Sequence, residues 1–226
     1  MAIKGILFDF NGTLFFDSKH HIRAFKEEYK KHGLHVRDDE YIIRNIFGRS
    51  NDTIFRQEYK PGATDAECVN FMREKEEFYI KSCTDEGNLR LAEGVPEMLD
   101  YLKEKGIPYC MATGSERVNV EFYFERLGIG RWFSYDNIVY TDGTFRGKPY
   151  PDIYLLEASR LGLKMSECLV FEDGTSGIKA AMAAGAGAIV AVYSPELPSP
   201  LNEDLVVDAV FHSFADYGKI LAGYGL

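Results

Sequence analysis

From Val95 onward, short apolar runs alternate with segments whose apolar residues recur at helical spacing, and this alternation constrains the fold most. Val95, Met98, Leu99 and Leu102 follow the i, i+3, i+4, i+7 pattern of one helix face, and Gly106 marks its end. An apolar run typical of a buried strand follows directly. Because strands that alternate with helices of this length need crossover connections, the pattern predicts a doubly wound, mainly parallel α/β sheet.

Six apolar runs, short and partly β-branched, are predicted to form the strands of this Rossmann-like core. They are Ile3–Phe8, Ile107–Ala112, Ile138–Tyr140, Leu169–Phe171, Ala188–Tyr193 and Ala209–Phe211. Helices are predicted between them at Val95–Lys105, Val120–Leu127 and Pro151–Leu161, and the spacing of Ile178, Ala181 and Met182 predicts the apolar face of another helix.

Between Asp17 and about Arg90 the pattern changes. Helical spacing dominates there, and no apolar run resembles a buried strand. The sequence therefore predicts an α/β core of residues 1–16 and 91–226, with an all-α domain of residues 17–90 inserted after the first strand. Within the insertion, the mixed charges of Arg73–Glu77 are typical of an exposed helix face.

Composition narrows the classes of function. The chain of 226 residues is 46% hydrophobic, which is enough for a packed core, and its formal net charge is −9. A negative protein is a poor match for nucleic acid, whose binding surfaces are usually positive. The uncharged run Ala180–Pro195 is too short to cross a bilayer, the N-terminal run does not resemble a signal peptide, and the four cysteines form no disulfide or zinc pattern. We therefore expect a soluble, cytoplasmic protein without nucleic-acid or membrane partners.

Polar residues follow three of the predicted strands, at the edge where the ligand crevice of a parallel sheet lies. They are Asp9 and Asn11 after the first strand, Thr113, Gly114 and Ser115 after the second, and Glu172 and Asp173 after a later one. Crowded carboxylates repel one another unless a cation lies between them, and oxygen ligands without Cys or His favour a hard ion. This arrangement predicts Mg²⁺, which binds one or two protein carboxylates together with substrate phosphate and water.

Lys148 lies in the loop before the helix predicted at Pro151–Leu161. A solvated loop lysine is one interpretation. The other is a fixed positive charge that shields a nucleophile and a phosphate group.

Four short motifs resemble, in the same order, those of the haloacid dehalogenase-like hydrolases. They are Asp9-Phe10-Asn11-Gly12-Thr13-Leu14, Thr113, Lys148 with Pro149, and Glu172-Asp173 followed by Gly174 and Gly177. The resemblance spans nearly the whole chain. The helical insertion is similar to the cap domain of the branch that contains beta-phosphoglucomutase and many small-molecule phosphatases.

This resemblance implies that Asp9 attacks phosphorus and becomes an aspartyl phosphate, a form of covalent catalysis by a carboxylate. It implies that Thr113 hydrogen-bonds the phosphoryl oxygens and that Lys148 acts as a charge clamp. The implied catalytic residues are Asp9, Asn11, Thr113 and Lys148, and the implied metal ligands are Asp9, the backbone carbonyl of Asn11, Asp173, and Glu172 as an adjacent acid.

The resemblance also implies a set of residues that contact a small phosphorylated substrate. In the core they are Gly12, Thr13, Gly114 and Ser115, and in the cap they are His21, Arg49 within Gly48-Arg49-Ser50, and Lys81 after Phe78-Tyr79-Ile80. The cap is expected to close, exclude water and select the substrate.

Asn11 departs from the family pattern, in which phosphatases and mutases carry an Asp two residues after the nucleophile. That Asp is the general acid and base, and an amide cannot carry its proton; such help is typically worth ~10² to 10⁴ in rate. Three explanations compete: a slow phosphatase suited to good leaving groups such as acyl or aryl phosphates, a dehalogenase reaction at carbon, or a laboratory substitution. The retained pair Glu172 and Asp173 argues against the dehalogenase, whose chemistry needs no metal.

The leading hypothesis is therefore a Mg²⁺-dependent phosphohydrolase that acts on a small phosphorylated metabolite. The cap resemblance supports an alternative, a beta-phosphoglucomutase-type phosphosugar mutase. Asn11 supports another, a weakly catalytic protein that binds a phosphometabolite. The sequence identifies neither the substrate nor the oligomeric state.

Overall fold

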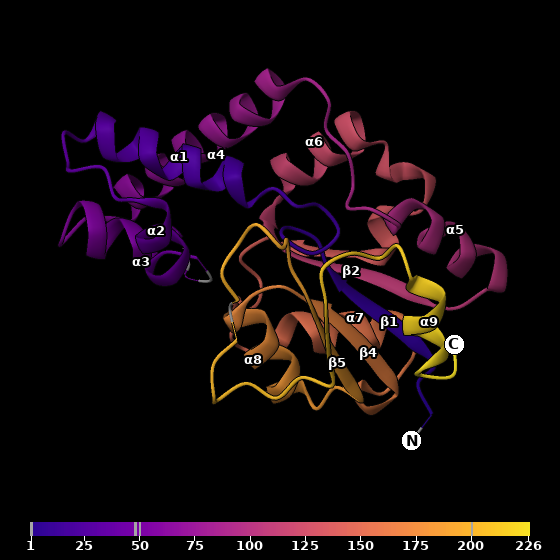
Figure 1. Cartoon of the computed structure of the whole chain (residues 1–226). Helices are drawn as coiled ribbons and strands as arrows, with labels where there is room; N and C mark the ends of the chain where they lie inside the picture. Colours follow the sequence, from indigo (N-terminus) through magenta and orange to yellow (C-terminus); the bar gives the residue numbers. More distant parts are fainter. Residues whose placement is uncertain (1, 48, 50, 200) are drawn as a thin grey trace. The chain divides into compact units, whose positions relative to one another are not determined.

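Parallel strands in the order β3-β2-β1-β4-β5-β6 build the central sheet of the α/β core (Figure 1). The strands are β1 Gly5–Asp9, β2 Tyr109–Glu116, β3 Ile138–Thr141, β4 Cys168–Glu172, β5 Ala188–Val192 and β6 Ala209–Phe211. The chain first extends the sheet to one side of β1 and then returns to the other side with β4. Open α/β sheets bind ligands at such a switch in strand order, beyond the carboxyl ends of the strands. The sheet confirms the predicted fold class.

The structure is a computed structural model that describes residues 2–47, 49, 51–199 and 201–226. Its contacts divide the chain into two units. One joins the residues up to Phe16 to Arg90–Leu226, and the other is Asp17–Leu89.

Helices cover both faces of the sheet in the first unit. They are α5 Val95–Lys105, α6 Arg117–Leu127, α7 Asp152–Arg160, α8 Thr175–Ala184 and α9 Tyr217–Ala222, with short 3-10 turns at Ile129–Arg131, Tyr135–Asn137 and Met165–Glu167. On one face, Leu7 and Val170 pack with Ile178 of α8 in one apolar cluster. Because side chains alternate along a strand, Phe8 points to the other face, where its ring stacks 5.2 Å from that of Phe171. The core therefore has three layers, with the sheet in the middle.

Two predicted elements differ from the structure, one in where a strand ends and one in which face of a helix is buried. The second strand was expected to end at Ala112, but β2 continues to Glu116, with a shift of register against β3 between Thr113 and Glu116. Pairing with a neighbouring strand carries β2 past its apolar run, so Thr113, Gly114 and Ser115 lie inside the strand. Met182 was expected on the apolar face of α8, yet it is 37% exposed. The helix packs through Ile178 and small Gly and Ala residues, which moves the buried stripe away from Met182.

The second unit consists of helices, and its described residues contain no strand. Its elements are α1 Ser18–Lys31, α2 Asp39–Asn45, α3 Asn51–Ile54, the π-helical turn η1 Phe55–Tyr59, and α4 Asp65–Glu86. A capping box between Thr64 and Glu67 begins α4, and Gly87 in the left-handed conformation follows its end. Ile22, Phe25 and Tyr29 of α1 are buried at the predicted helical spacing, in an apolar cluster with residues of α2, η1 and α4.

The charged run Arg73–Glu77 is not the uniform exposed face that its composition predicts. Lys75 and Glu76 are buried, with the Lys75 ammonium 2.8 Å from Oε1 of Glu76 and 3.0 Å from Nδ1 of His21. Opposite charges in contact reduce the cost of burial, which explains how two residues of a charged run reach the interior.

Two expectations from composition can be compared with the structure. All four cysteines are free and buried. Within the described ranges, no helix combines the length and the apolar character that crossing a membrane requires.

Tyr79 and Asp17 provide a test of the helical unit. Both are fully buried, and the Tyr79 hydroxyl donates a hydrogen bond of 2.6 Å to Oδ2 of Asp17. Tyr79→Phe removes one donor from a buried carboxylate, so we expect the free energy of unfolding to fall by about 1.5 to 3 kcal/mol, measured by urea denaturation.

Tyr150→Phe is the matched control for this variant. Its side chain is 51% exposed, so loss of the hydroxyl should leave stability almost unchanged. Equal stability of both variants would show that the buried hydrogen bond contributes nothing.

Candidate active site

Three acids meet at the carboxyl ends of β1 and β4. The two strands are neighbours in register, with Phe8 opposite Phe171, so Asp9 and Glu172 are the next residues along adjacent strands. One carboxylate oxygen from each of Asp9, Glu172 and Asp173 lies within 4.8 Å of the others. The change of strand order between β1 and β4 therefore brings together residues far apart in the sequence, at the crevice where such sheets bind ligands.

Lys148 joins two of these acids. Its ammonium donates hydrogen bonds of 2.5 Å to Oδ1 of Asp9 and 2.6 Å to Oε1 of Glu172. Burial opposes the positive charge, but the nearby carboxylates of Asp9 and Glu172 outweigh it and raise the pKa of Lys148 above its ordinary value. Lys148 is thus a fixed cation between two strand ends and not a solvated loop lysine.

Both carboxylate oxygens of Glu172 accept hydrogen bonds. Its Oε1 also accepts a hydrogen bond of 2.8 Å from the Tyr154 hydroxyl, and its Oε2 accepts bonds of 2.9 and 3.0 Å from the backbone N–H groups of Asp173 and Gly174. These contacts use most of the acceptor capacity of the carboxylate. Glu172 therefore orients Lys148 and the turn that carries Asp173.

Asn11 lies in a network of side chains from the first unit. Its Oδ1 accepts hydrogen bonds of 3.0 Å from the Thr113 hydroxyl and 2.9 Å from the Ser115 hydroxyl, and its Nδ2 donates one of 2.8 Å to the Tyr123 hydroxyl. Ser115 and Tyr123 are also 3.1 Å apart, hydroxyl to hydroxyl. The amide is therefore fixed by β2 and α6.

Tyr123 and Tyr154 are site residues that the sequence reasoning missed. Both lie in helices whose apolar spacing was recognised, and both are fully buried. A buried tyrosine usually needs a partner for its hydroxyl, and that requirement was the available signal.

The loop after β1 approaches Asp173 closely. Gly12 has φ +83°, and a Cβ at this position would lie 1.9 Å from Oδ2 of Asp173, so only glycine fits. Thr13 is fully buried, and its hydroxyl makes no hydrogen bond to the described residues. Gly114 is exposed and Ser115 is partly buried.

The acid cluster suits a divalent cation. Three carboxylates and the one ammonium of Lys148 leave a formal charge of −2, and the ligand set contains only oxygen. Hard cations such as Mg²⁺ prefer such ligands. Because its oxygens already accept hydrogen bonds, Glu172 is the weakest candidate ligand of the three acids.

The predicted substrate residues of the cap belong to the second unit. The His21 ring stacks 4.2 Å from the Tyr79 ring, and its Nε2 lies 3.4 Å from Oδ2 of Asp17. Arg49 is 3.3 Å from Oε1 of Glu58, and Gly48 and Ser50 lie outside the described residues.

Lys81 lies on an exposed face of α4, where its ammonium is 2.6 Å from Oδ2 of Asp85. The substrate contacts of His21, Arg49 and Lys81 stay a prediction.

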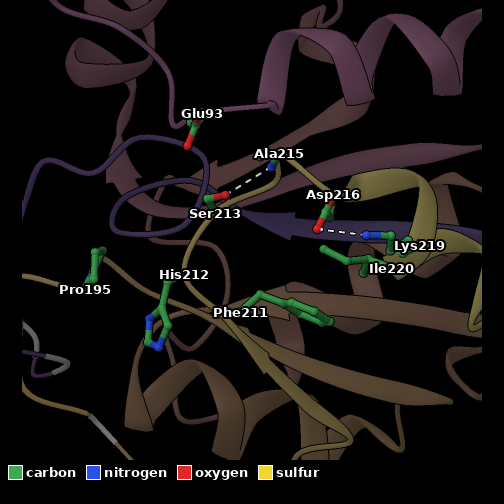
Figure 2. A pocket seen from close by; sticks show the side chains of 9 residues that line it. All are labelled: Glu93, Pro195, Phe211, His212, Ser213, Ala215, Asp216, Lys219 and Ile220. Atoms are coloured by element: carbon green, nitrogen blue, oxygen red, sulfur yellow. Dashed lines mark hydrogen bonds and ion pairs between the residues drawn. The ribbon is translucent and has the colours of Figure 1, made fainter.

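A separate pocket of ≈ 490 Å³ lies beyond β6 (Figure 2). Its lining residues are Glu93, Pro195, Phe211, His212, Ser213, Ala215, Asp216, Lys219 and Ile220. None of these belongs to the acid cluster. Within the pocket, Ser213 accepts a hydrogen bond from the backbone of Ala215, and Asp216 pairs with Lys219 (Figure 2). The acid cluster at β1 and β4 therefore contributes no residue to the lining of this pocket.

Comparison with known proteins finds one family over most of the chain. A family model described as haloacid dehalogenase-like hydrolase matches residues 3–185. Hexitol phosphatase A of Escherichia coli K12 is 32% identical over 213 residues, which cover 94% of this chain and 92% of that protein. Fructose-1-phosphate phosphatase YqaB of the same organism is 31% identical over 82% of this chain and 94% of its own.

Solved structures are similar to nearly the whole chain. A haloacid dehalogenase (HAD) hydrolase, family IA, variant 3, from Entamoeba histolytica superposes with a TM-score of 0.85 at 33% identity, covering 95% of each chain. A beta-phosphoglucomutase from Clostridium difficile has a TM-score of 0.78 over 98% of this chain and 97% of its own. The latter is 23% identical and shows likeness of fold alone.

Gly177 tests how Glu172 is positioned. A Cβ at this residue would lie 1.6 Å from Oε1 of Glu172. Helix propensity alone would favour alanine over glycine by about 1 kcal/mol, so a loss of stability in Gly177→Ala would come from this clash. We expect Gly177→Ala to displace the carboxylate, to lower the free energy of unfolding by about 1 to 3 kcal/mol, and to reduce turnover on the order of 10²-fold.

Gly218→Ala in α9 is the matched control, because no described atom other than those of its chain neighbours and its own helix backbone lies within 4 Å of its Cβ position. It should be neutral or slightly stabilising and should keep full activity. Normal stability and turnover of Gly177→Ala would contradict the positioning role of Glu172.

Proposed function

The chain belongs to the haloacid dehalogenase-like hydrolase family and is an enzyme of phosphatase type, and we propose that it is a Mg²⁺-dependent phosphohydrolase with Asp9 as nucleophile. The observation that carries the proposal is the contact of Asp9 with Lys148, beside Asp173 and Glu172 at the switch point of the sheet. Its substrate is a small phosphorylated metabolite.

In the proposed reaction, a carboxylate oxygen of Asp9 attacks the substrate phosphorus. The bond from phosphorus to the leaving oxygen breaks, and an aspartyl phosphate forms. Water then attacks this acyl phosphate, which releases inorganic phosphate and a proton and restores the carboxylate. The hydrogen bond from Lys148 orients Asp9. In our proposal, the Thr113 hydroxyl, which donates to Asn11 in this structure, would turn its proton to a phosphoryl oxygen when substrate binds.

A magnesium ion would be held by Asp9, Asp173 and the backbone carbonyl of Asn11. When bound, it neutralises charge on the phosphate group and orients it.

Asn11 determines which leaving groups the enzyme handles well. Its amide is fixed by Thr113, Ser115 and Tyr123, and its N–H groups are too weakly acidic to transfer a proton to a departing oxygen. The leaving oxygen must then depart as an anion or take its proton from water. Leaving groups of low pKa, such as acyl or aryl phosphates, tolerate this best, so we propose a slow phosphatase.

The names of the relatives guide the choice of substrates. Hexitol phosphatase A and the fructose-1-phosphate phosphatase act, by their names, on phosphorylated sugars and sugar alcohols. A phosphate-release screen should therefore compare sugar phosphates with acyl and aryl phosphates of similar size.

A phosphosugar mutase is distinguished from a phosphatase by its product. The mutase would convert beta-glucose 1-phosphate to glucose 6-phosphate in the presence of a bisphosphate activator. Release of inorganic phosphate without this product supports the hydrolase.

Asp9→Asn tests the nucleophile. We expect phosphate release to fall to background, because an amide does not attack phosphorus, and removal of Mg²⁺ with a chelator should have the same effect on the unmodified enzyme. Asp204→Asn, in an exposed loop, is the control and should keep full activity. Activity that survives both Asp9→Asn and the chelator would refute the mechanism.

Asn11→Asp tests the missing acid and base. If the rest of the site is intact, turnover should rise by roughly 10²-fold on alkyl phosphates and by less on acyl phosphates, which need no proton. Asn202→Asp adds the same charge at an exposed position and should change nothing. Tight binding without turnover in the unmodified protein, followed by activity in Asn11→Asp, would instead identify a phosphometabolite-binding protein.

A further inference from the structure

A second cluster of possible metal ligands lies in the helical unit. Glu28 on α1 and His32, the residue that follows this helix, are one helical turn apart, and Glu74 lies on α4. One ligand atom from each of the three residues lies within 4.8 Å of the other two. We name these residues the α1–α4 cluster.

Glu28 is the unusual member of this cluster. Its side chain is 0% exposed, and neither carboxylate oxygen accepts a hydrogen bond from the described residues. Its Oε2 lies 3.3 Å from Nε2 of His32, so the carboxylate is directed into the cluster. Buried carboxylates are nearly always hydrogen-bonded or bound to a cation, because an uncompensated one is costly.

The other two members of the cluster differ in how far their side chains can move. The ring of His32 is 5.6 Å from that of Phe55 and 5.7 Å from that of Tyr59, so aromatic contacts restrict the imidazole. Glu74 is partly exposed, and its Oε2 lies 2.5 Å from the ammonium of Lys31. A small rotation of Glu74 away from Lys31 would contract the cluster around an ion.

We propose that the α1–α4 cluster binds a zinc ion through Glu28, His32 and Glu74. One imidazole nitrogen and two carboxylate oxygens are ligands that zinc takes at about 2.0 to 2.2 Å, with water in the remaining position. The imidazole disfavours Mg²⁺ and Ca²⁺, which prefer oxygen alone. The chain thus has an all-oxygen cluster at its sheet and a mixed nitrogen and oxygen cluster in its helical unit.

Zinc at this position has a structural consequence. The ion links the end of α1 to the middle of α4, two helices that the sequence joins only through the segment between residues 32 and 64. It also supplies the charge partner that the buried Glu28 carboxylate needs. Zinc binding should therefore raise the melting temperature of the full chain.

Calorimetric titration of the metal-free full chain with ZnCl₂ tests the proposal. Saturating MgCl₂ and a parallel titration of Asp173→Asn exclude binding at the acid cluster of the core. A pH of 8 keeps Glu28 ionised, because burial raises the pKa of this carboxyl to about 7. We expect one equivalent of zinc in both proteins, and a visible d–d absorption band when Co²⁺ replaces it.

His32→Ala should weaken zinc binding at least tenfold and abolish the zinc-dependent rise in melting temperature. Glu28→Gln should do the same while keeping the volume of the buried side chain. His35→Ala is the matched control, because it removes an exposed histidine three residues away.

Two outcomes would overturn the proposal. One is the absence of zinc binding to the unmodified chain when MgCl₂ is saturating, which would leave Glu28 and His32 as a metal-free pair. The other is unchanged binding by His32→Ala. Because His32 is partly solvent-accessible, this variant should fold even if Glu28→Gln does not, and circular dichroism of the metal-free proteins checks this.

Discussion

The contact of Lys148 with Asp9 and Glu172 is the interaction on which the rest of the core site depends. Parallel pairing of β1 with β4 places two carboxylates side by side, and Asp173 adds a third. Without a cation, their mutual repulsion would oppose the register that brings them together. The lysine, drawn from the loop before α7, compensates this charge while leaving a net negative site. The same arrangement that stabilises the strand ends therefore also holds in place the carboxylate that we propose as the nucleophile.

The hydrogen bonds around Asn11 match an amide. Two hydroxyl groups, those of Thr113 and Ser115, donate to its oxygen, and the Tyr123 oxygen accepts from its nitrogen. A carboxylate in the same place would require Tyr123 to turn its proton inward. In the proposed reaction, an amide held in this way transfers no proton to the leaving oxygen. Under that proposal, the choice among leaving groups depends on this side chain as well as on the cap.

Much of the core could be predicted from local sequence, because apolar runs and helical spacing are local properties. The meeting of Asp9 with Asp173 followed from a rule about parallel sheets and needed no tertiary information. Tyr154 and the burial of Lys75 with Glu76 could not be predicted in this way, because each depends on a partner that local periodicity does not identify. The continuation of β2 through Ser115 was missed for a similar reason, since pairing with a neighbouring strand extends it. Sequence patterns thus located the strands and helices better than the contacts among their side chains.

The approach of Gly12 to Asp173 has a steric consequence. A Cβ at position 12 would occupy the place of the Asp173 carboxylate, so the loop after β1 and this side chain lie this close only because residue 12 has no side chain. Any other residue there would have to displace the carboxylate. A hydrogen atom in place of a methyl group thus leaves room for the third acid at this edge of the sheet.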